Sequence, residues 1–162
     1  MSDAGDTTTV SLAHVANHWD EVLDDAAATA AEYRSAGRTA IELHPGDVAL
    51  STGGRGRTGF DVVVPGEEYE RLRSALADHE IDAVDVFSQT AGGVVFLLVA
   101  AEAGDELAVL FPLYYGADDA ATLRRLAAND PLQIHVRPLD PSEAVSITVG
   151  DSGPFVPADS VE

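Results

Sequence analysis

The stretch from residue 84 to residue 115, VDVFSQTAGGVVFLLVAAEAGDELAVLFPLYY, decides the fold that we expect for this chain. It holds three strand-like segments, residues 84–90, 94–101 and 107–115, separated by the turn-rich joints AGG and EAGDE. Joints of this length connect antiparallel neighbours in hairpins. The stretch therefore predicts an antiparallel meander whose middle strand is apolar on both faces.

Helical patterns occur on both sides of this meander. Apolar residues recur at steps of three and four over about residues 11–36, which predicts a long amphipathic helix that stops at Gly37. The segment PGEEYERLRSAL, which starts at Pro65, predicts a second helix because proline and two glutamates suit a helix N-terminus. An alanine-rich stretch at residues 118–129 predicts a third helix.

Shorter strand-like segments complete the pattern, at residues 39–51 (a hairpin that turns at HPGD), 60–64, 132–136 and 145–149. Because hairpins dominate, we expect a single α+β domain over residues 1–150. In that domain about three helices pack on a single antiparallel sheet. The end of the chain, residues 151–162, is rich in glycine, proline and acid and is expected to be a flexible acidic tail.

The charge of the chain is strongly one-sided. The formal net charge is −19, all nine basic residues are arginine, and there is no lysine. Because 46% of the residues are hydrophobic and occur in periodic runs, the excess of acidic residues predicts a solvated acidic surface rather than disorder. At ~1 M salt the Debye length is about 3 Å, so self-repulsion falls away and we expect a halophilic protein. GC-rich coding would also favour arginine and alanine, and the composition does not separate the two causes.

The composition also limits partners and chemistry. No cysteine is present, so disulfides, thiolate nucleophiles and cysteine metal sites are excluded. The strong negative field makes nucleic acid a poor partner. The first ten residues lack the features of a signal peptide, and the longest apolar run, Val94 to Ala101, is far shorter than the ~20 residues of a membrane span. We expect a cytoplasmic protein with no membrane partner.

The glycine-rich segment STGGRGRTGF, residues 51–60, raises the question of a phosphate site. A P-loop needs a lysine and a helix after its glycines, whereas this segment has no lysine and leads into the strand FDVVV. The glycines therefore predict a turn. The alternative is a contact of Arg55 and Arg57 with an anion or a partner.

Four polar residues line one side of the first predicted helix: His14, His18, Glu21 and Asp25. Two histidines one turn apart can bind a divalent transition metal, and a nearby carboxylate can add a ligand. The HxxxH spacing lacks the adjacent glutamate of a zincin motif. The stripe also lies one residue off the apolar one, where polar residues normally flank a buried helix face.

A third set combines Gln133, His135 and Arg137, which share one face of a predicted strand, with Tyr114 and Tyr115 at the end of another. If the two strands are neighbours, these residues border a shallow polar and aromatic pocket that could bind a ligand. The alternative is the solvated face of a half-covered sheet.

The segments HVANHWDEVLDDAAATAAEYRSAG, IELHPGDVAL and LFPLYY resemble a family of unknown function from halophilic archaea. The resemblance implies a haloarchaeal source. The leading order αββαβββα, which covers most of the chain, also resembles the roadblock and profilin-like folds. It is similar to a lesser degree to secretion-chaperone-like folds. These resemblances imply a dimeric binding scaffold.

We therefore expect a small, non-enzymatic binding or adaptor domain that forms a homodimer or binds a protein partner. One alternative is a metal-dependent enzyme that uses His14 and His18, with Glu21 or Asp25 as third ligand or base. Another is a sensor of a small anionic ligand contacted by Arg55, Arg57 or Arg137. No cofactor other than the possible metal is expected.

Overall fold

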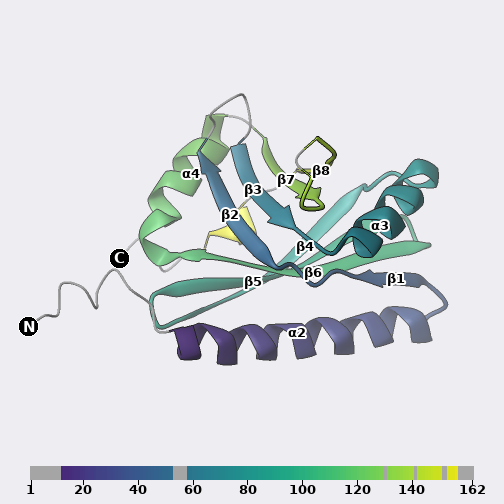
Figure 1. Cartoon of the computed structure of the whole chain (residues 1–162), viewed down its shortest axis with the longest axis horizontal. Helices are drawn as coiled ribbons and strands as arrows, with labels where there is room; N and C mark the ends of the chain where they lie inside the picture. The colour runs from purple at the N-terminus through teal and green to yellow at the C-terminus, as the bar shows by residue number, and fades with distance from the viewer. Residues whose placement is uncertain (1–11, 53–57, 130, 141, 151–152, 157–162) are drawn as a thin grey trace, which may run out of the picture.

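The computed structural model describes residues 12–52, 58–129, 131–140, 142–150 and 153–156. Its helices are α2 (Leu12–Ser35), α3 (Gly66–Asp78) and α4 (Ala120–Asn129). Two 3₁₀ turns complete the helical elements: η2 (Ala117–Asp119), directly before α4, and η3 (Gly153–Phe155), near the end of the chain. The strands are β1 (Thr39–Glu42), β2 (Asp47–Thr52), β3 (Thr58–Val63), β4 (Ala83–Ala91), β5 (Val94–Ala103), β6 (Leu107–Gly116), β7 (Leu132–Arg137) and β8 (Val145–Val149) (Figure 1). The α+β class and the three helices that the sequence predicts are confirmed.

The strands form two four-stranded sheets, so the prediction of a single antiparallel sheet is wrong. The first sheet has the order β1-β6-β5-β4 and contains the predicted meander β4, β5 and β6. The second has the order β2-β3-β7-β8. Each sheet is mixed, because β1 runs parallel to β6 and β3 runs parallel to β7. Such parallel pairs join strands that are distant in sequence, and local alternation does not encode them.

The predicted hairpin over residues 39–51 is also wrong. Its two strands belong to different sheets, since β1 pairs with β6 and β2 pairs with β3. The segment HPGD therefore carries the chain from one sheet to the other, and the amide of Gly46 donates to the carbonyl of Val63 at 2.8 Å. The antiparallel hairpin lies one strand later, between β2 and β3, and residues 53–57 at its tip lie outside the described residues.

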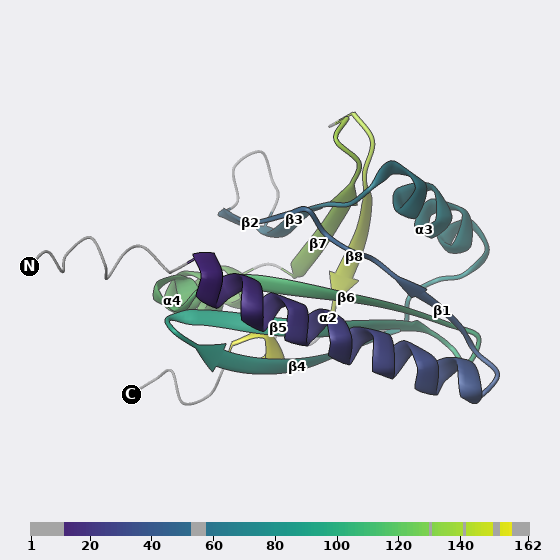
Figure 2. The same ribbon diagram turned by 60° about the horizontal axis from the view of Figure 1, so that its bottom comes forward.

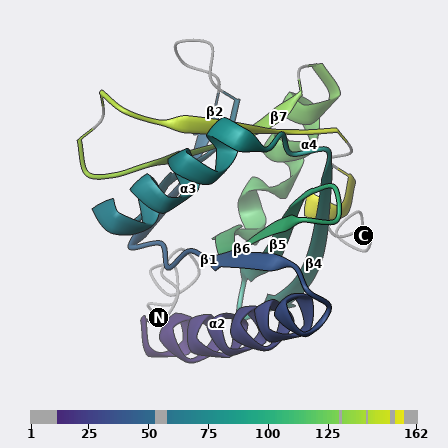
Figure 3. The same ribbon diagram turned by 90° about the vertical axis from the view of Figure 1, so that its right-hand side faces the viewer.

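The molecule is layered as helix, sheet and sheet (Figure 3). Helix α2 covers one face of the first sheet, and the second sheet packs against the other face with its strands running steeply across (Figure 1). Side chains of β5 alternate between the two cores: Phe96 and Leu98 face α2, whereas Leu97 and Val99 face the second sheet. This double burial confirms the prediction that the middle strand of the meander is apolar on both faces.

Helices α3 and α4 flank the second sheet at opposite ends (Figure 1). Each contributes its apolar face to the core between the sheets, through Tyr69 and Leu72 of α3 and Leu123 of α4. Phe155 in η3 joins the same core, is fully buried, and accepts a 2.7 Å hydrogen bond from the hydroxyl of Tyr115. Phe155 lies within residues 151–162, where the sequence predicts a loose tail, so the packed domain extends past residue 150.

Helix α2 ends where the sequence predicts. Gly37 has φ of 88°, its amide donates to the carbonyl of Arg34, and the next amide, that of Arg38, donates to the carbonyl of Tyr33. This pair of hydrogen bonds is a Schellman motif, which needs a residue with positive φ after the helix. The motif turns the chain into β1 and places Arg38 beside the last turn of α2. Within the described residues, no helix is both long enough and apolar enough to cross a lipid bilayer.

Candidate functional site

Strand β4 exposes a face that α2 does not cover. Helix α2 packs against β1, β5 and β6, and β4 lies beyond β5 at the edge of the sheet (Figure 2). On the α2 side of β4, Asp85 pairs in register with Ala100 and Phe87 with Leu98. Leu98 is buried under α2, whereas Phe87 is 63% exposed. Phe87 and Leu139 are the exposed large apolar residues of the described part of the chain, and Phe87 is the one that lines a hollow.

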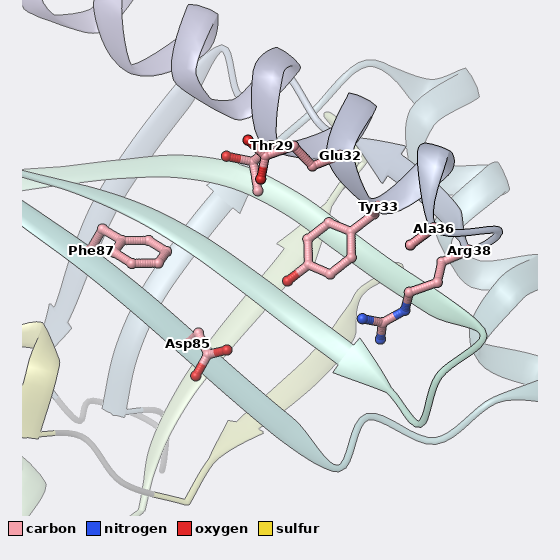
Figure 4. A pocket seen from close by; sticks show the side chains of 7 residues that line it. All are labelled: Thr29, Glu32, Tyr33, Ala36, Arg38, Asp85 and Phe87. Carbon is pink, nitrogen blue, oxygen red and sulfur yellow. The ribbon is translucent and has the colours of Figure 1, made fainter.

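A hollow of about 420 Å³ lies between α2 and β4 beside this ring. It is lined by Thr29, Glu32, Tyr33, Ala36, Arg38, Asp85 and Phe87 (Figure 4). The amphipathic spacing of α2 explains its wall, because residues 29, 32, 33 and 36 follow each other at helical steps on one side. Strand periodicity explains the opposite wall, because residues 85 and 87 point to the same face of β4.

A polar network closes one end of the hollow. The hydroxyl of Tyr33 donates to Glu102 at 2.7 Å, and the guanidinium of Arg38 donates to the same carboxylate at 3.3 Å and to the carbonyl of Gly104 at 2.6 Å. The guanidinium carbon of Arg38 also lies 4.7 Å from the centre of the Tyr33 ring, a cation–π contact. Among the described residues, the buried Nε of Arg38 has no hydrogen-bond acceptor.

The environment of Tyr33 disfavours its ionised form. Burial raises the pKa of Tyr33 to about 12, and the hydrogen bond to Glu102 and the negative charges of Glu102 and Asp85 act in the same direction. Arg38 opposes them. Tyr33 is therefore a hydrogen-bond donor at neutral pH and not a base.

The remaining charges around the hollow are negative. Glu32 projects from α2 and Asp85 from β4, on opposite walls (Figure 4). Within the part of the chain that the structure describes, neither carboxylate takes part in an ion pair or a hydrogen bond. The positive charge of Arg38 is already paired with Glu102. The hollow thus presents two aromatic rings and two unpaired carboxylates to solvent.

Residues 5–157 match the model of a family of unknown function (DUF7529). This match covers nearly the whole chain. The chain belongs to the DUF7529 family. No curated protein and no solved structure matches this chain.

In this DUF7529 protein the predicted metal residues are not gathered into a described site. The side chain of His14 lies outside the described residues. The ring of His18 stacks on Phe96 at 5.4 Å between centroids, and Glu21 and Asp25 are exposed. Among the described residues, no group of three or more metal-binding side chains has the geometry to hold an ion. The metal site at His14 and His18 stays a prediction.

Of the three arginines predicted to bind an anion, the structure describes only Arg137. Arg55 and Arg57 lie outside the described residues. The Nε of Arg137 contacts Asp61 at 3.3 Å, and its Nη1 donates to the carbonyls of Pro138 and Leu139. The charge of Arg137 is therefore balanced within the protein.

The structure does not bring the predicted polar and aromatic pocket together. Tyr114 and Tyr115 are on opposite faces of β6: Tyr114 meets Trp19 of α2 edge-on at 5.5 Å, and Tyr115 points into the core. Gln133, His135 and Arg137 do share one face of β7, as predicted, but β7 belongs to the other sheet. There the Nδ1 of His135 lies 2.8 Å from the hydroxyl of Ser146 on β8.

The sequence analysis missed the hollow between α2 and β4. One signal was available: Val84 and Val86 alternate with Asp85, Phe87 and Gln89, so Phe87 is an apolar residue on the polar side of β4. The partners of Phe87 come from a helix more than 50 residues away, and only the fold brings them to it.

Proposed function

We propose that this chain is a non-enzymatic binding or adaptor domain that forms a homodimer through the edge of β4. The exposed ring of Phe87 carries the proposal, because it lies in the middle of a nine-residue edge strand. Natural proteins protect exposed edges with charge, proline or bulges. Residues 86–91 of β4 have no charge and no proline, in a chain whose formal charge is −19.

A second copy fits this edge. In an antiparallel pair centred on Phe87, the two Phe87 rings lie together and Asp85 stands opposite Gln89 of the second copy. Asp85 is the only charged residue of β4, so this register places no two carboxylates opposite each other. Aromatic pairs across strands contribute about 0.2–1 kcal/mol each, and like charges opposite each other destabilise the pair.

Salt strengthens this proposed contact. Two copies that each carry a formal charge of −19 repel at low ionic strength. At ~1 M salt the Debye length of about 3 Å removes most of that repulsion, while apolar contacts and strand pairing persist. We therefore propose that the dimer works in a salty, haloarchaeal cytoplasm.

The test measures mass by light scattering during gel filtration at micromolar concentration, in 0.1 M and in ~1 M salt. We expect twice the chain mass of 16.9 kDa at high salt and a smaller mass at low salt. Phe87→Asp should weaken the dimer about 30-fold or more, because it removes the central contact and adds two facing charges. Leu139→Asp is the matched control, since Leu139 is 84% exposed and follows β7 of the second sheet.

Two results would overturn the homodimer. One is a wild-type monomer at high salt and high micromolar concentration. The other is a dimer that Phe87→Asp leaves intact, which would place the interface elsewhere. Circular dichroism of both variants checks that each remains folded.

A further inference from the structure

We propose that the hollow between α2 and β4 binds a small organic cation, with an alkylammonium or guanidinium head group, between Glu32 and Asp85 and against the ring of Phe87. This inference goes beyond self-association. It concerns the hollow between α2 and β4, whereas the proposed dimer pairs the backbone edge of β4 and shares only the ring of Phe87 with that hollow.

The charges of the hollow select for a cation. Its unpaired carboxylates, Glu32 and Asp85, come from opposite walls, so both make the hollow favourable for a positive group (Figure 4). Arg38 does not compete for them, because Glu102 and the carbonyl of Gly104 hold its guanidinium at the end of the hollow. An anion would meet these carboxylates and find only a guanidinium that is already paired.

The aromatic rings select for an organic cation over an alkali ion. Phe87 is 63% exposed, and Tyr33 lines the opposite, α2 wall of the hollow. Weakly hydrated ammonium and guanidinium groups are attracted to the faces of aromatic rings, with about 0.5–2 kcal/mol for each contact. A strongly hydrated alkali ion prefers several oxygen ligands and gains little from a ring. The hollow also provides Ala36 as an apolar wall.

The size of the hollow fits a free small molecule. Its volume of about 420 Å³ lies in the range of about 300–1,000 Å³ that is usual for ligand pockets. We therefore commit to a free cation rather than the side chain of a basic protein. Because apolar burial is not electrostatic and ring contacts act at contact distance, salt should weaken this binding less than it weakens binding to a site made of carboxylates alone.

The experiment titrates isotopically labelled full-length protein with tetramethylammonium and with guanidinium, at constant high potassium chloride, and records amide shifts by NMR. We expect saturable shifts at the residues that line the hollow. Tert-butanol, which is neutral and of similar shape to tetramethylammonium, should bind at least about tenfold more weakly. Asp85→Asn and Glu32→Gln should each weaken tetramethylammonium binding about three- to tenfold. Asp24→Asn, an equal charge change at an exposed position of α2, should not.

Phe87→Leu keeps an apolar side chain but removes the aromatic ring. It should also weaken tetramethylammonium binding about three- to tenfold. The proposal is overturned if no lining residue shifts, if tert-butanol binds as well as tetramethylammonium, or if Asp24→Asn and Asp85→Asn act alike. A peptide rich in arginine that binds much more tightly than either small cation would also overturn the commitment to a free molecule. A monomeric protein that binds the cation refutes the dimer alone, and a dimer that does not bind it refutes this inference alone.

Discussion

The hydroxyl of Tyr33 in α2 donates a 2.7 Å hydrogen bond to Glu102 at the end of β5, although 69 residues separate the two in sequence. The other oxygen of Glu102 accepts from Arg38 at 3.3 Å. One carboxylate thereby ties the last turn of α2 and the residue after its C-terminal cap to the first sheet. The position of that turn sets one wall of the candidate site.

Glu102→Gln should lower the free energy of unfolding by about 1–3 kcal/mol, because both hydrogen bonds lose their ionised acceptor and Arg38 loses its ion pair. Denaturant unfolding at high salt measures the change. Glu80→Gln is the control, since Glu80 is exposed, and it should change stability by less than about 0.5 kcal/mol. Equal effects of the two substitutions would contradict the role of Glu102.

The phenols of Tyr33 and Tyr115 should ionise late, because burial raises the pKa of each to about 12. The unfolded pKa is about 10, so the stability due to both groups is complete below pH ~10 and is lost as pH rises through 12. Tyrosinate absorbance during alkaline titration measures this, with unfolding followed in parallel. Tyr33→Phe should remove one late phenol. If that variant loses a phenol that ionises near pH 10, the network at Tyr33 is not formed.

Gly59→Ala should destabilise the second sheet by about 3 kcal/mol or more. Gly59 has φ of 136°, and a β-carbon built on it would lie 1.9 Å from the carbonyl oxygen of Gln133 on the paired strand β7. That contact is between two backbones, and neither can move without breaking the β3–β7 pairing. Gly46→Ala is the control, because no atom lies within 4 Å of its built β-carbon. Thermal unfolding of the two variants compares them, and similar melting temperatures would refute the close approach.

Phe155→Ala should lower the free energy of unfolding by about 3–5 kcal/mol, as expected for a fully buried aromatic ring. The centre of this ring lies 6.2 Å from the centre of the Phe60 ring. Leu139→Ala, at an exposed apolar residue, should cost less than about 0.5 kcal/mol. Chemical denaturation gives both values. A loss below about 1 kcal/mol for Phe155→Ala would show that η3 is not part of the core.

The imidazole of His79 should titrate above its ordinary pKa. The largest cause is its hydrogen bond with the carbonyl of Ala75 at 3.1 Å, and the carboxylate of Glu106 at 3.2 Å acts in the same direction, whereas desolvation opposes them. A raised folded pKa stabilises the protein fully below pH ~6.5, and the effect disappears as pH rises through the folded value. NMR titration identifies the resonance by its absence in His79→Gln. A midpoint at or below 6.5 would contradict the contacts.

Local sequence patterns predicted most helices and strands, because helical and strand periodicity are properties of neighbouring residues. The Gly37 stop, the three helices and the meander with its doubly apolar middle strand are all confirmed. The pairing of strands was beyond those patterns. Residues 39–42 and 47–52 are close in sequence, yet they enter different sheets, because 39–42 pair with the distant strand β6 and 47–52 pair with the next strand, β3.

By itself the sequence determined which segments are helical or extended, which of them are buried on both faces, and the acidity of the whole chain. The tertiary structure decided which side chains meet. Phe87 occupies an ordinary strand position, and it becomes the centre of a candidate site because α2 covers β5 and stops short of β4. The reason is geometric: a helix is about 10 Å wide, so α2, which lies on β1, β6 and β5, does not reach β4 at the far edge of the four-stranded sheet.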